Sequence, residues 1–183
     1  MTPPLLSIKS ESDISSLATY SLAPSDFNLL QTAATNAKTT SYSPYSNFRV
    51  GCALLTHSGA IITGANVENA SYPVTTCAER VAFGKAITEG HRGFKAVAVA
   101  TDISPPASPC GMCRQCIREF CDVRVPIIMF DGEGGFSVMR LEEVSYSYEQ
   151  MEGGANAGVA SSNVVWAGGV GGCGADEGEG VMC

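Results

Sequence analysis

Cysteines are the feature that most restricts how this chain can fold. Four of the eight cysteines in its 183 residues, Cys110, Cys113, Cys116 and Cys121, fall within one short segment. The N-terminus lacks the basic start and apolar stretch of a signal peptide, so we expect a reducing, cytoplasmic location. Clustered cysteines in such a compartment bind metal or do chemistry more often than they form disulfides. The chain is therefore expected to fold around a metal or redox site.

Two motifs place three cysteines at expected helix starts. The first is Thr76-Cys77-Ala78-Glu79, and the second is Pro109-Cys110-Gly111-Met112-Cys113. Cys110 and Cys113 are three residues apart, so they share one face of a helix. A helix N-terminus favours negative charge and lowers thiol pKa values. Cys77, from the neighbouring helix, can complete a site of three thiolates.

Zinc is the metal that such a site predicts, because thiolate ligands and tetrahedral geometry suit it. Three protein ligands leave one position for water, which is typical of a catalytic site. Glu79 follows Cys77 by two residues, so its carboxylate is expected beside the metal without binding it. Zinc lowers the pKa of bound water to about 7, and a nearby carboxylate can then take its proton.

Each of these residues also has a plainer interpretation. Glu79 fits the last position of a capping box that starts at Thr76, and Cys77 alone would suit a buried apolar site. The Cys110–Cys113 pair alone leaves structural zinc and redox chemistry open. Cys110, Cys113 and Cys116 follow an iron–sulfur spacing, but residues 114–120 form an amphipathic helical pattern. We expect Cys52, Cys116 and Cys121 to be packed core thiols.

The hydrophobic pattern predicts an α/β domain with a mixed sheet. A helix is expected from Pro24 with Ser25 as its cap, a second over 75–89, and a third from Ser108, again as cap, to about 121. Strands are expected over residues 48–56, 61–66, 96–100, 127–130 and 136–139. The order α-β-β-α-β-α-β-β indicates strands and helices in layers.

The two ends of the chain differ from its middle. Residues 1–23 are Ser-rich and weakly patterned, so we interpret them as a flexible N-terminal arm. Residues 24–151 form the expected domain. Residues 152–183 hold ten of the chain's 20 glycines, a composition that cannot bury enough apolar surface to order itself, and are expected to be a disordered tail.

Charge and hydropathy bear on the partners. The net charge of −7 shows no basic footprint of the kind that grips nucleic-acid phosphates, so no nucleic-acid partner is expected. No apolar run approaches the roughly 20 residues that span a bilayer, so no membrane partner is expected either.

The motifs together resemble the small, homotetrameric, zinc-dependent cytidine deaminases of the cytidine/deoxycytidylate deaminase superfamily. Cys77-Ala78-Glu79 is followed by Pro109-Cys110-x-x-Cys113, in which Cys110 stands 33 residues after Cys77. Residues 43–51, Ser-Pro-Tyr-Ser-Asn-Phe-Arg-Val-Gly, and residues 64–73, Gly-Ala-Asn-Val-Glu-Asn-Ala-Ser-Tyr-Pro, extend the resemblance. It covers roughly residues 27–148.

The resemblance implies a three-layer α-β-α fold with a mixed five-stranded sheet. It implies hydrolysis of free cytidine, and of 2′-deoxycytidine, to the uridine product and ammonia, in pyrimidine salvage. One zinc ion per chain would be held by Cys77, Cys110 and Cys113. Glu79 would take a proton from the zinc-bound water, pass it to ring N3, and then protonate the leaving amine.

The resemblance also implies roles for the residues around the zinc. Phe48 would stack on the pyrimidine, the Ala78 amide would bind the base carbonyl, and Arg80 would offset the charge of three thiolates. Asn66 and Glu68 would bind the ribose hydroxyls. In the tetramer, Ala70 and Tyr72 would reach a neighbour's site. Tyr148 stands where the family often has a phenylalanine lid.

Two other functions stay open at this point. One is deamination of a different cytosine-containing substrate, either a base in RNA or DNA or a nucleoside antibiotic. The other is a structural zinc module, which would need a fourth protein ligand such as Cys116.

Overall fold

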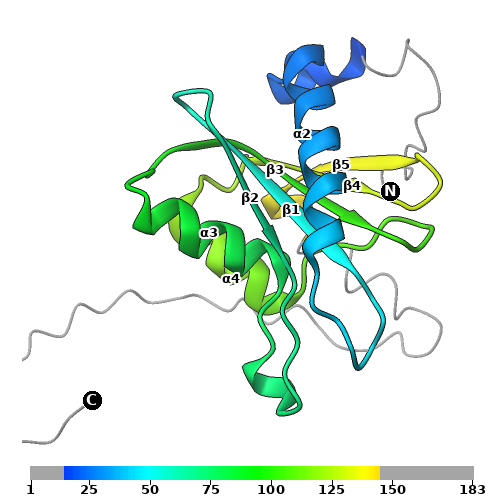
Figure 1. Ribbon diagram of the computed structural model, residues 1–183. Helices are drawn as coiled ribbons and strands as arrows, with labels where there is room; N and C mark the ends of the chain where they lie inside the picture. Colours follow the sequence, from blue (N-terminus) through cyan, green and yellow to red (C-terminus); the bar gives the residue numbers. More distant parts are fainter. Residues whose placement is uncertain (1–14, 145–183) are drawn as a thin grey trace, which may run out of the picture. The chain divides into compact units, whose positions relative to one another are not determined.

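The computed structural model describes residues 15–144 of the chain, and a five-stranded sheet lies at its centre (Figure 1). The strands follow the order β2-β1-β3-β4-β5 across the sheet. Their bounds are β1 Val50–Thr56, β2 Ile61–Ala65, β3 Phe94–Thr101, β4 Pro126–Phe130 and β5 Phe136–Arg140. The five predicted strands are therefore confirmed, with ends that differ by a few residues.

The sheet is mixed, as the alternation of elements predicted. β1 pairs antiparallel with both β2 and β3, and β5 pairs antiparallel with β4. The β3–β4 pair alone among these is parallel. A parallel pair needs a crossover connection, and here the chain between the two strands contains α4, Gly111–Phe120. The crossover brings the start of α4 back to the C-terminal end of β3.

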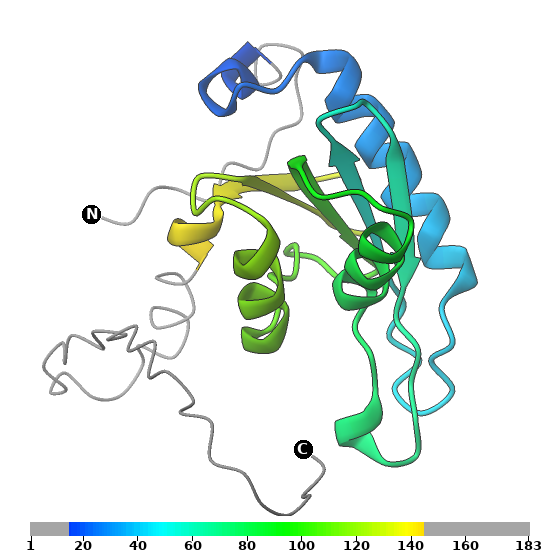
Figure 2. The same cartoon turned by 90° about the vertical axis from the view of Figure 1, so that its left-hand side faces the viewer.

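Helices cover both faces of the sheet, which gives the expected three layers (Figures 1 and 2). α2, Pro24–Ala37, lies on one face, while α3, Ala78–Thr88, and α4 lie on the other. β3 shows why both faces are apolar, because its side chains alternate between them. Ala96, Ala98 and Ala100 join the core beneath α2, and Val97 and Val99 join the core beneath α3 and α4.

Two glycines let these helices pack close to the sheet. A Cβ atom at Gly51 would stand 2.1 Å from the carbonyl oxygen of Ala34 in α2. A Cβ atom at Gly64 would stand 2.5 Å from the backbone nitrogen of Ala82 in α3. Real Cβ atoms do not approach that closely, so only glycine fits either strand position. The place of α3, and of Cys77 before it, thus depends on Gly64.

The predicted caps of two helices, α2 and α4, require correction. Ala23, not Ser25, precedes α2, and Pro24 occupies its first turn. Cys110, not Ser108, is the N-cap of α4, and Cys77 holds the same position in α3. Neither cysteine makes a side-chain capping bond, and both keep extended backbone angles. Ser108 and Pro109 suit a helix start by residue type, so the predicted cap of α4 lay two residues too early.

Part of the expected N-terminal arm packs against the domain. Residues Ser15–Tyr20 form a short 3₁₀ helix, and Leu17 and Leu22 are buried in the core beneath α2. The Tyr20 hydroxyl also donates to the carbonyl oxygen of Val138 in β5, at 3.2 Å. The Ser-rich composition gave no sign that these two leucines are buried. The interpretation as a flexible N-terminal arm is therefore wrong for residues 17–22.

Several expectations fall on residues that the structure does not describe. Residues 1–14 of the arm, the tail over 152–183 and the lid candidate Tyr148 lie outside the described range. Within residues 15–144, no helix has the length and apolar character that crossing a bilayer requires.

Candidate metal and nucleoside site

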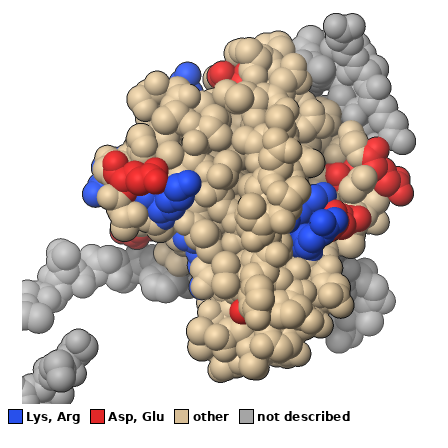
Figure 3. Space-filling view, viewed as in Figure 1, with Lys and Arg blue, Asp and Glu red and all other residues tan. Residues whose placement is uncertain are grey.

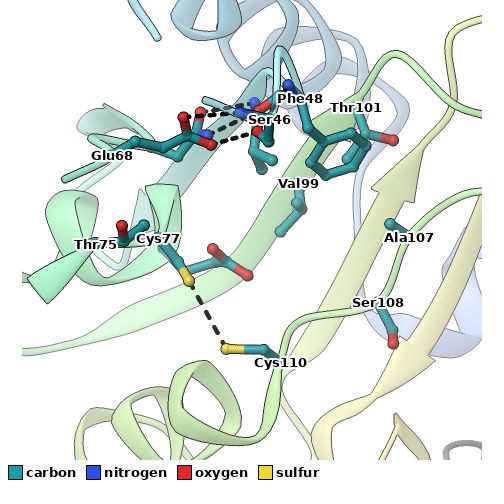
Figure 4. A pocket seen from close by; sticks show the side chains of 13 residues that line it. Ser46, Phe48, Glu68, Thr75, Cys77, Val99, Thr101, Ala107, Ser108 and Cys110 are labelled. Carbon is teal, nitrogen blue, oxygen red and sulfur yellow. Dashed lines mark hydrogen bonds between the residues drawn. The ribbon is translucent and has the colours of Figure 1, made fainter. Parts of the chain in front are cut away.

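Three sulfur atoms meet where α3 and α4 begin. The Sγ atoms of Cys77, Cys110 and Cys113 all lie within 4.8 Å of one another. Cys77 and Cys110 are the two helix N-caps, and their sulfur atoms are 3.8 Å apart (Figure 4). Cys113 lies one turn into α4 and is fully buried. The predicted set of three ligands is thus brought together by two helices from different parts of the chain.

The spacing of the sulfur atoms fits a zinc ion. Tetrahedral zinc with Zn–S bonds of about 2.3 Å holds its sulfur ligands about 3.8 Å apart. The Cys77–Cys110 separation of 3.8 Å agrees with this value, and the third sulfur atom lies within the same small cluster. Magnesium and calcium prefer oxygen ligands, so a set of three sulfur donors excludes both as the natural metal.

The iron–sulfur cluster and the structural zinc module both need a further cysteine ligand, and the described residues do not supply one. Cys116 does not belong to the sulfur cluster and packs instead against the core beneath α3 and α4. An iron–sulfur arrangement of Cys110, Cys113 and Cys116 is therefore not formed, and a fourth protein ligand is not present in residues 15–144. Cys52 and Cys121 are buried core thiols, as expected.

Glu79 is a buried carboxylate at the base of the site. Only 4 % of its surface is exposed, and it lines the same cavity as Cys77 and Cys110. The capping-box interpretation is excluded, because Cys77 is the N-cap and the Thr76 hydroxyl bonds to the carbonyl oxygen of Val74. A carboxylate is seldom buried without a chemical reason, since desolvating its charge is costly.

Burial and the sulfur cluster change the protonation of these groups. Burial is the main cause that raises the pKa of Glu79 to about 7. The hydrogen bond with Cys113 is the largest cause that lowers the pKa of Cys77 to about 5, with Arg80 and Cys110 contributing. The same contact, together with burial, raises the pKa of Cys113. Zinc binds the deprotonated form of a thiol, and the lowered pKa of Cys77 favours that form.

Arg80 adds positive charge beside the cluster. Its Nη2 atom lies 3.7 Å from the Cys77 sulfur and donates to the carbonyl oxygen of Thr75, at 2.9 Å. Its Nε atom is buried and has no hydrogen-bond partner within the described part of the chain. An ordinary surface arginine would not be placed this way. The hydrogen bond and the charge of Arg80 both contribute to the lowered pKa of Cys77.

A cavity of about 250 Å³ opens above the sulfur atoms. Figure 4 shows Phe48 and Thr101 on its far wall, with Val99 between them and the cysteines. Phe48 is half-buried and belongs to neither core cluster, so it is not a plain packing residue. The remaining lining residues come from four chain segments: Ser46, Val50, Asn66, Glu68, Thr75, Cys77, Glu79, Ala107, Ser108 and Cys110.

Asn66 lines the cavity but is already bonded within the chain. Its Oδ1 atom accepts from the Ser41 hydroxyl at 2.5 Å and from the Val50 amide at 2.9 Å. Its Nδ2 atom donates to the carbonyl oxygen of Phe48, at 2.9 Å. One amide hydrogen is left for a ligand. Asn66 therefore ties the loop before β1 to the end of β2, a role that its position in the sequence did not reveal.

Glu68 also holds this loop. Its Oε2 atom accepts from the backbone amides of Tyr45, at 2.9 Å, and Ser46, at 3.2 Å. Its Oε1 atom accepts a short hydrogen bond from the Ser46 hydroxyl. That hydroxyl bond is the largest of the causes that lower the Glu68 pKa. The group is thus a carboxylate at neutral pH, and it faces the cavity from the wall opposite Thr101 (Figure 4).

The other expected substrate contacts occupy different places. Ala78 is fully buried at the first turn of α3, beside the sulfur cluster. Ala70 and Tyr72 are exposed and do not line the main cavity. Tyr72 instead lines an adjacent hollow of about 300 Å³, together with Tyr45, Glu68 and Asn69. The chain by itself does not bring Ala70 or Tyr72 to the sulfur atoms.

Three polar residues of the cavity wall were not among the predicted site residues. Ser46, Thr101 and Ser108 each line the cavity. Thr101 is 1 % exposed, and its hydroxyl has no hydrogen-bond partner within residues 15–144. Serine and threonine are common in loops and strands, so type and spacing alone do not mark them. The signal that was available for Ser46 was its place two residues before Phe48.

Comparison with known proteins agrees with this geometry. The family model of the cytidine and deoxycytidylate deaminase zinc-binding region matches residues 25–129. The chain is 43 % identical over 135 residues to a cytidine deaminase of Sporosarcina psychrophila, covering 68 % of this chain and 99 % of that protein. It is 49 % identical over 100 residues to a probable cytidine deaminase of Dictyostelium discoideum, covering 54 % of this chain and 68 % of that protein.

A solved structure supports the same assignment of the fold. The crystal structure of cytidine deaminase from Burkholderia pseudomallei aligns with a TM-score of 0.62 and 39 % sequence identity. The alignment covers 64 % of this chain and 94 % of that one.

Proposed function

This chain belongs to the family of cytidine and deoxycytidylate deaminases, and from that premise we propose that it hydrolyses free cytidine to uridine and ammonia. The same site accepts 2′-deoxycytidine. The observation that carries the proposal is the buried Glu79 carboxylate beside three sulfur atoms, at the base of a cavity of about 250 Å³. A nucleoside fits such a cavity, with the amine of its base next to Glu79 and the three sulfur atoms.

The reaction needs one group that moves protons in both directions. Zinc, when bound by Cys77, Cys110 and Cys113, supplies a water molecule of lowered pKa as the nucleophile. The Glu79 carboxylate accepts a proton from that water and delivers it to N3 of the base. A bond forms between C4 and the water oxygen. Glu79 then takes the remaining proton from the new C4 hydroxyl and passes it to the amine, and the C4–N bond breaks to leave a carbonyl at C4 and free ammonia. A carboxyl group with a pKa near 7 suits both steps.

The cavity walls orient the nucleoside. Phe48 stacks on the pyrimidine, and the backbone N–H of Ala78 donates to the carbonyl oxygen of the base. Glu68 accepts from a sugar hydroxyl, and the remaining amide hydrogen of Asn66 donates to another. These roles are supported by the placement of Phe48, Asn66 and Glu68 on the cavity wall and of Ala78 beside the cluster.

The charge of the surface favours a small substrate over a polynucleotide. Figure 3 shows one face of the molecule, where lysine and arginine side chains lie in separate groups next to acidic ones. The whole chain carries a net charge of −7. A single-stranded polynucleotide would need a continuous basic path across the surface to neutralise its phosphates.

The functional unit is a homotetramer in the cytoplasm that serves pyrimidine salvage. Its assembly is supported by exposed apolar side chains in two segments, 42–45 and 67–74, that adjoin cavity-lining residues in the chain, because such side chains grouped in one region mark interfaces. They are Tyr42, Tyr45, Val67, Tyr72 and Val74. A neighbouring subunit on this surface would bring Ala70 and Tyr72 to an adjacent site. The reduced state of the six described cysteines agrees with a cytoplasmic location.

An absorbance assay with purified protein tests the proposal. Cytidine and 2′-deoxycytidine should both be converted, a zinc chelator should abolish conversion, and added zinc should restore it. A single-stranded oligonucleotide that contains cytosine and a cytosine nucleoside antibiotic serve as competing substrates. Faster turnover of either one than of cytidine, or full activity after verified metal removal, would show that the proposal is wrong. Light scattering of the same sample should give the mass of four chains.

A further inference from the structure

One hydroxyl lies between the two cavity residues that recognise different parts of the nucleoside. Ser46 Oγ donates to Oε1 of Glu68 and accepts from the backbone N–H of Phe48, at 3.0 Å. Dashed lines in Figure 4 mark the bonds between Ser46 and Glu68. A hydroxyl has one donor and two acceptor positions, so both bonds form at the same time. Ser46 thus joins a carboxylate on one wall to the backbone of an aromatic residue on another.

The backbone of Phe48 is held from its other side as well. Its carbonyl oxygen accepts from Asn66 Nδ2, at 2.9 Å. Both backbone polar groups of Phe48 are therefore bonded to residues of the cavity wall. The ring itself is half-buried and is not packed in either core cluster. Because the core does not fix the ring, its position depends on how firmly its backbone is held.

We propose that Ser46 is a positioning residue, which couples sugar binding at Glu68 to the placement of the Phe48 ring over the base. This inference rests on the proposed function. A carboxylate offers about four acceptor positions, and three hydrogen bonds within the chain reach Glu68. One position is left for a sugar hydroxyl, so substrate and Ser46 bind the carboxylate together. Hydrogen bonds to a charged group are about twice as strong as neutral ones, which makes this link a firm one.

Kinetics of a double-mutant cycle test the coupling. Ser46→Ala removes both hydrogen bonds of an exposed hydroxyl, and such bonds contribute at the lower end of their usual range. It should therefore lower kcat/KM on cytidine by roughly three- to tenfold. The loss should appear mainly in KM, because neither Glu68 nor Phe48 contacts the reacting carbon. Ser46→Thr keeps the hydroxyl and should restore most of the loss. In a Phe48→Ala background, Ser46→Ala should change kcat/KM by less than about twofold.

A matched control separates this effect from the loss of any serine hydroxyl. Ser58 is likewise exposed and bonds through its hydroxyl to Thr56, at 2.9 Å, in the β1–β2 turn outside the cavity. Ser58→Ala should leave KM unchanged. If Ser46→Ala matches this control, or has the same effect with and without the Phe48 ring, the coupling is disproved.

A second measurement does not depend on activity. The chain has seven phenylalanines, so labelling with 4-fluorophenylalanine gives few ¹⁹F resonances, and Phe48→Leu identifies the one from position 48. Ser46→Ala should shift or broaden that resonance in the substrate-free protein, while Ser58→Ala should not. An unchanged resonance overturns the inference even if the enzyme deaminates cytidine. A changed resonance in a protein that does not act on cytidine would instead uphold the link and reject the proposed function.

Discussion

At the scale of single residues, the site combines groups that would be costly to bury separately. Glu79 and Cys113 are both buried, and three sulfur atoms lie within 4.8 Å of one another. Unpaired charges in such a place destabilise the fold, and a divalent cation held by the three sulfur atoms would compensate them. The burial that raises the pKa of Glu79 also keeps bulk water from competing for its proton.

Replacing Glu79 should remove proton transfer while leaving the zinc site and the fold unchanged. Glu79→Gln keeps the size of the side chain and removes its ability to carry a proton. We expect kcat to fall by about 10²–10⁴-fold, the range for general acid–base catalysis. Zinc content and melting temperature should stay near the wild-type values, as measured by metal analysis and calorimetry. Near-normal kcat in a zinc-loaded variant would contradict the role of Glu79.

Removing one sulfur atom should release the metal. Cys110 is the most exposed of the three ligands, so Cys110→Ala leaves no cavity in the core. We expect zinc content to fall from one ion per chain to a small fraction of that, with the sheet intact by circular dichroism. Cys116→Ala serves as the matched control on the same helix and should keep its zinc. Full occupancy in the Cys110 variant would rule out the ligand set.

At the scale of elements, two glycines set how close the helices come to the sheet. Gly51→Ala should lower the free energy of unfolding by about 2–3 kcal/mol, because its new methyl group would overlap the carbonyl oxygen of Ala34. Gly84→Ala provides the control, since that helical position has open space around it. Alanine there should raise stability by up to about 1 kcal/mol. Denaturant titration of both variants distinguishes close packing from a general intolerance of glycine replacement.

The sequence predicted which helices and strands form more accurately than it predicted where the helices begin. Strand positions in β3 and β4 follow from continuous apolar runs, and the β1–β2 turn follows from His57-Ser58-Gly59, with Gly59 at a φ of 87°. The helix caps were misplaced because Ser25 and Ser108 are good caps by type, and only the path of the chain decides which residue is used.

The same limit applies to the site. The three cysteines and Glu79 could be selected because zinc chemistry demands those residue types at a recognisable spacing. The bonds of Asn66 and Glu68 to residues 41–50 could not, because they join segments whose meeting depends on the packed sheet. Leu17 and Leu22 were missed for a similar reason, since their burial depends on a surface that other elements create.

At the scale of the whole molecule, an ion pair cluster ties three separate segments together beside the cavity. Asp102, just after β3, bonds to Lys38 after α2, at 2.7 Å, and to Arg49 before β1, at 2.9 Å. Lys38 also donates to the carbonyl oxygen of Thr101, at 3.1 Å. The cluster therefore fastens the wall that carries Thr101 to the helix on the opposite face.

This cluster should make stability depend on acid pH. The hydrogen bond with Lys38 is the largest of the causes that lower the Asp102 pKa below 3.8. A lowered folded-state pKa stabilises the fold above the unfolded-state value, and this stabilisation is lost as the pH falls through the folded value. Asp102→Asn should cost about 0.5–1 kcal/mol at pH 7, given its partial exposure. The difference from wild type should shrink as the pH falls below 3.8, and it should vanish once the Asp102 carboxyl is protonated in both the folded and the unfolded state. A constant difference across the titration would mean that the charge of Asp102 is not responsible.

X-ray absorption at the zinc edge counts the atoms bound to the metal, so it shows whether three cysteines leave one position for water. We expect three sulfur atoms at about 2.3 Å and one lighter atom, oxygen or nitrogen, at about 2.0 Å. The lighter atom should be exchangeable, so its signal should change when a nucleoside analogue fills the cavity. A shell of four sulfur atoms that no ligand alters would contradict this expectation, because it would leave no position at which a water molecule could be activated.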